Sequence, residues 1–569
     1  MRHLLVKDLL SLLSSKSTIT RQRSGEYFEW INSNLIDFVN EFVQKNKLLE
    51  SHFIKMMNKT FETTRFELLL KRWITEYLEK LFEALEDSKE LILGDNPISR
   101  FGVKKYSLSF TIPPKIKWRK EPTTLQRLCS ILIRSVIIAY LSLNKGIKIS
   151  GKRKKHKVMR EALLGLYDVG GYYFHDDFII DGVKIKKEDI LLFFRGITKD
   201  ESRLKGYDDA KRSPYEHFDL QSLSMGIGPI FSRIIPKYII SGSRILLKEI
   251  KSDHFSLYWS IYLYFKYSAL PYEKVFSHFE VISEFAHNCF TASHIPEAII
   301  CQNYGTRYYF MIWSDMAIKI NEYTVSYLGC DGYLSWGKAH ITGLEGDPRI
   351  LMLTGFPFKR FIKEVISNRK NVLSDMGISA KGKIITFFDE SFGGGCKMTE
   401  ENFVTFWETA LKLAQKEPGN TILIKPKELV RYNNLSYSLK ERFSYIKSKM
   451  EKLPNVYIVD ENKWSFIECI GVSDIVITQG MTTSSTIAII CGIEGLYLDE
   501  AQYDHPFSRL FKDRIVFDDY LELLVMVSKI LEGKENPLKD IPEDVLRDFD
   551  TYKDDIGIDR FRDILLCKT

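Results

Sequence analysis

A cluster of five hydroxyl side chains, Thr482 to Thr486, is the group of residues best suited to grip an anion. It follows a Gln-Gly pair and an apolar segment at 475–478, and a second apolar run after it ends at Cys491. The segment is typical of a strand and the run of a helix, which we expect to begin at Thr486. Free N–H groups at a helix N-terminus favour anions, and capping alone needs only one hydroxyl. We therefore predict a phosphate-binding turn made of Gln479, Gly480, Thr482, Thr483, Ser484 and Ser485.

Two other predicted strand ends carry residues that suit the same ligand. FFDESFGGGCK combines acids with three glycines, which let backbone approach a ligand closely, and ILIKPKE ends in two lysines that can neutralise a diphosphate. Each feature alone equally suits an ordinary surface loop or surface lysine. Because the carboxyl ends of parallel strands meet at one edge of a sheet, their convergence favours a binding site. The residues added to that site are Asp389, Glu390, Ser391, Gly393, Gly394, Gly395, Lys425 and Lys427.

Three residues of the first half are the candidates for catalysis. His294 stands at the start of a predicted helix in TASHIPEAII, and Glu297 lies one helical turn further on. A histidine there can act as an acid, a base or a hydrogen-bond donor to a leaving phosphate. Asp315 follows the predicted strand RYYFMIW. A packed histidine and structural carboxylates are equally good interpretations, so both remain open.

Composition describes an ordinary ordered protein of several domains. The chain has 569 residues, of which 45% are hydrophobic and 27% charged, so two to four domains are expected and disorder is excluded. Eight scattered cysteines without a CxxC pair argue against structural zinc, and no signal peptide is recognisable. These features predict a cytoplasmic protein. The net charge of +7 is mild and accompanies no nucleic-acid motif, so nucleic acid is not an expected partner.

Residues 128–160 combine an apolar run with a basic cluster. LCSILIRSVIIAYLSL is shorter than a membrane span and contains Arg134, and GKRKKHKVMR follows it. We favour a buried helix followed by a solvated basic loop. The alternative is peripheral docking on an anionic membrane surface.

The chain divides into three regions by pattern. Residues 1–95 carry apolar side chains at helical spacing and form a helical N-terminal region, ended by the breaker GDNPISRFG. Residues 96–350 alternate short apolar strands with helices from about Lys187 onward, after the helical and basic insertion. Residues 351–569 repeat this alternation more clearly and end in a helical tail. The predicted fold class is α/β, with two βα domains that each contain a parallel sheet.

These features together resemble glycosyltransferases of the GT-B architecture, and more closely the capsule-type Kdo transferases and teichoic-acid glycerophosphotransferases. The resemblance covers about residues 185–530 and rests on two βα domains, a TGFP hinge, and SDIVIT followed by hydroxyls. It implies two Rossmann-like domains that face a cleft. It also implies that Ser473, Asp474, Thr478 and Thr482 to Ser485 border the phosphates of a donor nucleotide.

One departure from the family pattern bears on nucleotide recognition. Many relatives have a glutamate that grips the ribose and then a Gly-x-Pro; here Ile487 and Glu494 stand at the glutamate and proline positions. Ile487 cannot contact a ribose in that way. Asp499 and Glu500, after the next strand, are the possible substitutes.

The resemblance implies a metal-independent transferase that moves a sugar from a nucleotide sugar to a surface glycan or lipid-linked acceptor. No cofactor is expected beyond this donor, and the protein would work in the cytoplasm or at the inner face of the plasma membrane. Three alternatives remain: transfer of a polyol phosphate from a CDP-linked donor, epimerisation of a nucleotide sugar, and an inactive scaffold in a polysaccharide assembly complex.

Overall fold

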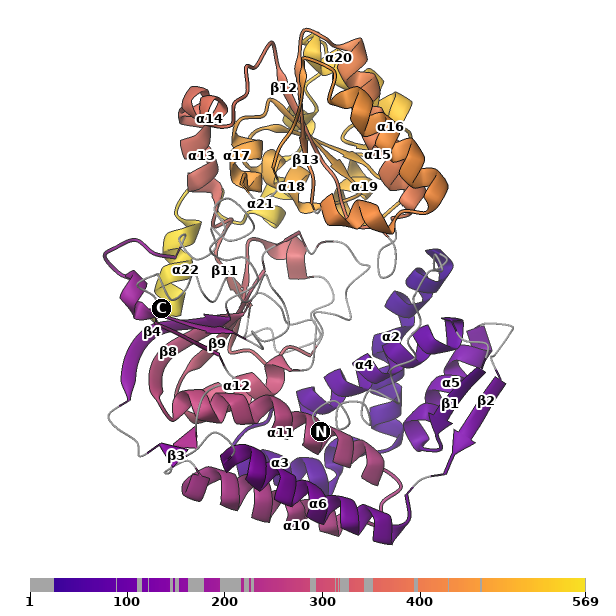
Figure 1. The fold of residues 1–569 in the computed structure, drawn as a ribbon, viewed down its shortest axis with the longest axis vertical. Helices are drawn as coiled ribbons and strands as arrows, with labels where there is room; N and C mark the ends of the chain where they lie inside the picture. The colour runs from indigo at the N-terminus through magenta and orange to yellow at the C-terminus, as the bar shows by residue number, and fades with distance from the viewer. Residues whose placement is uncertain are drawn as a thin grey trace.

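A computed structural model provides the structure of the chain, and its two large parallel sheets, one in each half, confirm the predicted α/β class (Figure 1). Two βα domains are what the GT-B resemblance implies. The structure describes residues 25–87, 90–109, 115–120, 122–143, 147–148, 153–161, 179–194, 216–219, 225–226, 230–286, 293–312, 314–315, 317, 327–341, 351–392, 398–427, 429–460 and 463–567.

The second half contains a six-stranded sheet in the order β14-β13-β12-β15-β16-β17. All its pairings are parallel, and β12, β13 and β15 are buried throughout, as expected of strands covered on both faces. Helices α15, α16 and α20 lie on one side and α17 and α18 on the other (Figure 1). The strands are β12 (Ile384–Phe388), β13 (Thr421–Lys425), β14 (Val456–Ile458), β15 (Ile475–Gln479), β16 (Glu494–Leu498) and β17 (Val516–Phe517). The helices are α13 (Lys359–Ser367), α14 (Arg369–Asp375), α15 (Glu400–Lys416), α16 (Tyr437–Met450), α17 (Phe466–Gly471), α18 (Thr483–Ile490), α19 (Pro506–Leu510), α20 (Tyr520–Leu531), α21 (Glu543–Phe549) and α22 (Gly557–Leu565).

The first half contains a seven-stranded sheet in the order β11-β10-β9-β8-β4-β5-β6, also parallel throughout. Its helices include α11 and α12, which pack against each other. The strands are β4 (Lys154–Glu161), β5 (Ile190–Phe194), β6 (Glu216–Asp219), β8 (Phe279–Ala286), β9 (Arg307–Met311), β10 (Gly332–Ser335) and β11 (Leu351–Leu353). The helical segments are α6 (Thr124–Leu143), the π-helix η4 (Ile230–Ser241), α10 (Gly242–Lys248), α11 (Phe255–Phe276), α12 (His294–Asn303) and the 3-10 turn η6 (Lys338–Ile341).

The basic segment that follows α6 differs from both sequence interpretations, because it is a strand in the middle of the first sheet. Strand β4 pairs with β8 on one side and β5 on the other, and its Val158 and Met159 are fully buried. Acids on adjacent elements compensate its lysines: Lys154 binds Glu216, and Lys157 lies 3.0 Å from Asp189. The prediction of a solvated basic loop here is therefore wrong, and docking of residues 128–160 on an anionic membrane stays a prediction.

The N-terminal region is helical over residues 25–87, as predicted, while its residues 1–24 lie outside the described residues, and its helices α2 and α4 pack against each other. GDNPISRFG ends strand β1, but a helix starts within it, because proline suits the first turn and Asn96 accepts a hydrogen bond from Ser99 N at 2.9 Å. None of the helices in the described ranges combines the length and apolar character needed to cross a bilayer. The elements are α2 (Gly25–Lys45), η1 (Leu48–Glu50), α3 (His52–Phe61), α4 (Phe66–Asp87), β1 (Glu90–Gly94), α5 (Pro97–Ser109) and β2 (Lys115–Arg119).

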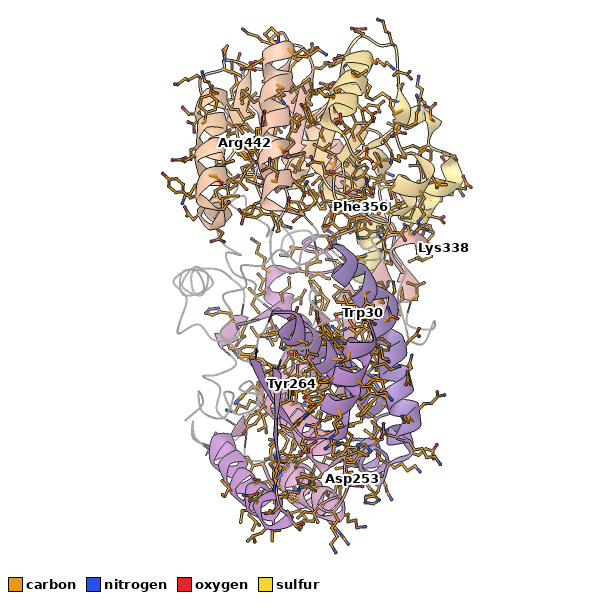
Figure 2. All side chains as sticks on the ribbon, turned by 90° about the vertical axis from the view of Figure 1, so that its right-hand side faces the viewer. Trp30, Asp253, Tyr264, Lys338, Phe356 and Arg442 are labelled. Carbon is orange, nitrogen blue, oxygen red and sulfur yellow. The ribbon has the colours of Figure 1, made fainter. Side chains whose placement is uncertain are left out.

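The chain crosses between the two halves twice. The first crossing follows β11, and Phe356 lies where the halves meet (Figure 2). The second follows α21 and brings α22 onto the first sheet, where Phe561 packs edge-on against Phe285 of β8 (Figure 1). Asp550 connects the crossings, since it accepts from Phe356 N at 3.0 Å and from Lys359 Nζ at 2.9 Å. Strand β11 thus belongs to the first sheet and helix α22 packs against that sheet, although the predicted boundary at residue 351 groups both with the second domain.

Candidate functional site

Four of the predicted donor-site segments lie at the carboxyl edge of the second sheet. Asp389 to Ser391 follow β12, Lys425 ends β13, Gln479 ends β15 and Asp499 follows β16. These strands are neighbours in one parallel sheet, so their ends share one edge. Gly393, Gly394 and Gly395 lie outside the described residues.

The turn from β15 into α18 is built on a left-handed glycine. Gly480 has φ +63°, donates its N–H to Leu498 O at 2.7 Å, and receives a bond from Thr482 N at 2.9 Å. Thr482 is then extended and serves as the N-cap, so α18 begins at Thr483, three residues before the predicted start. The first N–H groups of a helix have no partner within the helix and open toward this edge.

Three of the five hydroxyls of this cluster are engaged within the protein, and one of these is Thr483, whose Oγ1 accepts from Asp315 N at 3.0 Å. Ser485 is fully buried and donates to Leu496 O at 2.7 Å, while Thr478 Oγ1 donates to it at 3.1 Å, so it ties the helix to the strands. Thr486 is also buried and hydrogen-bonded. Thr482 and Ser484 are half-buried, and their hydroxyls have no hydrogen-bond partner among the described residues. These two remain available to a ligand.

Gln479 adds a buried amide to the same turn. Its Oε1 accepts a hydrogen bond from Glu390 N at 3.1 Å, which fixes the amide orientation and links β15 to the loop after β12. Its Nε2 is buried and has no hydrogen-bond partner among the described residues. A buried donor without a partner costs free energy, so an acceptor from a ligand would satisfy it.

Asp389 is held by hydrogen bonds from the protein itself. It accepts from Lys427 N at 2.6 Å, from Trp407 Nε1 at 3.1 Å and from Tyr432 OH at 3.2 Å, so both carboxylate oxygens are occupied. Burial raises its pKa to about 6, against the effect of these hydrogen bonds. Its contacts fix the loop after β13.

The lysines at this edge are held by the protein itself. Lys427 pairs with Glu390, which also accepts from Ser391 N at 2.7 Å. Burial alone would raise the pKa of Glu390, but Lys427 outweighs it and lowers that pKa. Lys425 is buried and donates to Pro426 O at 3.0 Å.

Two residues named by the resemblance lie at the opposite edge. Ser473 and Asp474 precede β15, where Asp474 accepts from Ile384 N at 2.8 Å and from Arg369 Nη2 at 2.6 Å. They join β12, β15 and α14, so the expectation that they border the phosphates is wrong. Ile487 is buried in the core. Asp499 accepts from Tyr503 N at 2.8 Å, and Glu500 from Asn402 Nδ2 at 3.2 Å.

Asp315 lies in a buried polar cluster between the two halves, at the base of α18. Its Oδ1 is 3.2 Å from His340 Nδ1 and its Oδ2 is 3.2 Å from His505 Nε2. Thr486 donates to the same carboxylate, and Asp315 N donates to Thr483 Oγ1 at 3.0 Å. Asp315 and His340 come from the first half, and the other three from the second.

The electrostatics of this cluster favour an ionised Asp315. Burial alone would raise its pKa, but the electrostatic interaction with His505 and the hydrogen bonds of both histidines outweigh that effect and hold the pKa well below its ordinary value. His505 Nδ1 accepts from Phe507 N at 3.1 Å, which leaves Nε2 to carry a proton toward Asp315. Both imidazoles are fully buried. The cluster therefore fixes α18 to the first half.

His340 and His505 are not among the residues predicted from the sequence. Each follows a strand of its own sheet, β10 and β16, which is the signal that could have identified them. The other two catalytic candidates contact their own domain: His294 Nε2 accepts from Gly329 N at 3.3 Å, and Glu297 accepts from Tyr308 OH at 3.3 Å. Both are buried. Their catalytic role, like that of Asp315, stays a prediction.

The fold and this edge define an α/β protein with two parallel-sheet domains. No protein-family model and no curated protein matches the sequence. Solved structures with a similar course of chain include the wall teichoic acid polymerase TagF soaked with CDPG, which is 10% identical, with 78% of this chain and 96% of that chain covered and a TM-score of 0.42. They also include the UDP-GlcNAc 2-epimerase from Neisseria meningitidis bound to UDP-GlcNAc (10% identity, 73% and 100% covered, TM-score 0.43) and S. aureus MnaA with UDP (9%, 72% and 94%, TM-score 0.39).

Proposed function

We propose that the protein is a glycosyltransferase that binds a nucleotide-activated sugar at the carboxyl edge of its second sheet and transfers the sugar to a surface-glycan or lipid-linked acceptor. The observation that supports this most is the turn from β15 into α18. There a helix N-terminus, two hydroxyls without a partner in the part of the chain that the structure describes, and the buried Nε2 of Gln479 occur together. All are hydrogen-bond donors, and donors suit the oxygens of a diphosphate.

The same groups explain how the reaction would be assisted. In sugar transfer, negative charge grows on the diphosphate as its bond to the sugar breaks. Donors fixed in advance stabilise that charge without reorganising, and the helix dipole adds to their effect. Gly480 and Gln479 hold these hydrogen-bond donors in place, because Gly480 sets the turn and Gln479 ties the turn to the loop after β12. The acceptor would come from the side of the first domain.

Nucleotide binding is the direct test. The purified chain is titrated by calorimetry with UDP-, GDP- and CDP-linked sugars, CMP-Kdo and CDP-glycerol. We expect one nucleotide class to bind, and Thr482→Val with Ser484→Ala to weaken it at least about tenfold, since hydrogen bonds to charged groups contribute about 1.5–3 kcal/mol. Ser436→Ala is the matched control, because Ser436 also caps a helix of this domain without a side-chain cap bond.

The other functions give different results in the same experiment. A CDP-polyol phosphotransferase would bind only the CDP-linked polyol, and an epimerase would convert a nucleotide sugar without any acceptor. A scaffold would bind no nucleotide, and that result would refute the proposed function. Equal weakening by Ser436→Ala would show that the two hydroxyls have no specific role.

A further inference from the structure

Helix α6 exposes an apolar stripe to solvent. The stripe consists of Leu125 (69% exposed), Leu132 (59%), Ile133 (58%) and the exposed Cys129. Their spacing of four, three and one residues places them on one face of the helix. The opposite face is fixed to the protein: Ile131 is buried, and Arg127 donates to Ile250 O at 2.9 Å. An amphipathic helix ordinarily has its apolar stripe turned toward the core, and here a second stripe faces outward.

The neighbouring segment η4–α10 repeats this feature. It packs against α6, and Phe231, Ile240 and Leu247 on it are 65%, 59% and 43% exposed. Six of the eighteen large apolar side chains exposed in the described ranges therefore lie on α6, η4 and α10. Figure 1 shows α6 and α10 together at the end of the molecule away from the second domain. We call the exposed side of these three segments the α6–α10 face.

The charges of this face have one sign. Segments 124–143 and 230–248 contain six arginines and lysines and no acidic residue. Three of the six are engaged nearby: Lys237 with Glu62 at 3.1 Å, Arg233 with Glu273 at 3.9 Å, and Arg127 with the backbone oxygen of Ile250. Arg244 and Lys248 are exposed and form no ion pair with a described residue. Glu249 and Asp253 lie beyond the end of α10.

We propose that the α6–α10 face docks on the surface of an anionic phospholipid bilayer. Exposed apolar side chains among basic ones are what a helix needs in order to lie in the lipid interface, where the side chains enter the headgroup region and the cations meet the phosphates. The absence of acids from segments 124–143 and 230–248 favours lipid phosphate over a protein surface of mixed charge. The proposal does not depend on the proposed transfer reaction, and its test needs no turnover.

Vesicle flotation of the full chain tests the proposal. Vesicles of phosphatidylcholine alone are compared with an equimolar mixture of phosphatidylcholine and phosphatidylglycerol. We expect binding to the anionic vesicles only, weakened by salt as the surface potential is screened. Arg244→Gln with Lys248→Gln should weaken partitioning about 30-fold, about fivefold for each basic residue. The matched control, Lys452→Gln with Lys539→Gln, removes two exposed lysines of the second domain and should bind as the wild type does.

A second pair of variants tests the apolar contribution. Phe231→Ser with Ile240→Ser should weaken partitioning about tenfold or more, whereas Leu521→Ser with Val525→Ser, equally exposed on α20, should not. Thermal melts confirm that each variant is folded. Equal binding to neutral vesicles, or no binding to anionic ones, would overturn the proposal. So would a change from dimer to monomer in the Phe231 and Ile240 variant without lipid binding, because the face would then join two copies of the chain.

Discussion

Replacing Asp315 by asparagine tests whether its cluster holds the two domains together. The carboxylate faces His340 and His505 at 3.2 Å each, accepts from Ala317 N at 2.9 Å and receives a bond from Thr486. An asparagine is neutral and replaces one oxygen by an NH₂ group. One histidine would then face a donor instead of an acceptor, inside a region from which water is excluded.

The magnitude follows from burial. Asp315 is 5% exposed and both imidazoles are fully buried, so solvent cannot replace the lost interactions. Removing one partner of a buried charged pair costs about 3–5 kcal/mol, much of it from leaving the other partner unsatisfied. We expect Asp315→Asn to lose that amount of unfolding free energy. We also expect it to separate the unfolding of the two domains, because the cluster joins α18 and His505 to the first half.

Urea denaturation between pH 3 and 8, followed by circular dichroism and tryptophan fluorescence, measures both effects. The pKa of Asp315 is depressed in the folded state, so its contribution is complete above about pH 4 and is lost as the pH falls below that. The variant should lack this part of the acid dependence. A loss below about 1 kcal/mol at pH 7, with coincident transitions retained, would refute the reasoning, because the cluster would then contribute little to the junction.

Four further substitutions have distinct expected outcomes. Asp389→Asn should be less stable than the wild type, because its NH₂ group would face one of the donors that bind the carboxylate, and it should also lose the pH dependence of Asp389. Burial raises the pKa of Asp389 to about 6, so wild-type stability declines from about pH 4 to 6 by up to about 3 kcal/mol, and urea titration of the variant should show no such decline. Gly480→Ala should lose about 1–2 kcal/mol and weaken nucleotide binding in calorimetry, because φ is +63° and the new Cβ would lie 3.2 Å from Tyr503; wild-type affinity would contradict this. Ser485→Ala should lower the free energy of unfolding by about 1–2 kcal/mol and leave nucleotide affinity unchanged. Ser484→Ala should instead weaken nucleotide binding and leave stability unchanged. A loss of affinity in both variants would place Ser485 at the ligand.

The second sheet was predictable because each of its strands is a local apolar run between turn residues. IITFF, TILIK and IVITQ are buried throughout, as such runs require. The start of α18 was not predictable to the residue. Several adjacent hydroxyls can each cap a helix, and only the positive φ of Gly480 and the extended backbone of Thr482 select Thr482 as the cap. This choice moves Ser485 from the predicted turn into the helix interior.

Strand β4, in contrast, could not be predicted from the sequence. Its sequence is dominated by lysines, and local hydropathy gives no sign of a central strand. What makes the strand possible is distant in sequence, since Glu216 and Asp189 on other elements compensate its charges. Pairings between remote segments of this kind cannot be derived from local pattern, and the same holds for Asp315 with His505, which lie 190 residues apart.

The junction and the proposed donor turn are parts of one structure. Thr482 and Ser484, which would meet the donor, alternate along the chain with Thr483, which accepts from Asp315 N, and Ser485, which is tied to β16. A shift of the first domain relative to the second would therefore move the first turn of α18. It follows that Asp315→Asn should weaken donor binding as well as stability, without any contact between Asp315 and the donor.

Asp389→Asn, whose contacts stay within one domain, should leave the position of α18 unchanged. Comparing nucleotide affinity in these two variants at pH 7 separates coupling through the junction from a general loss of stability.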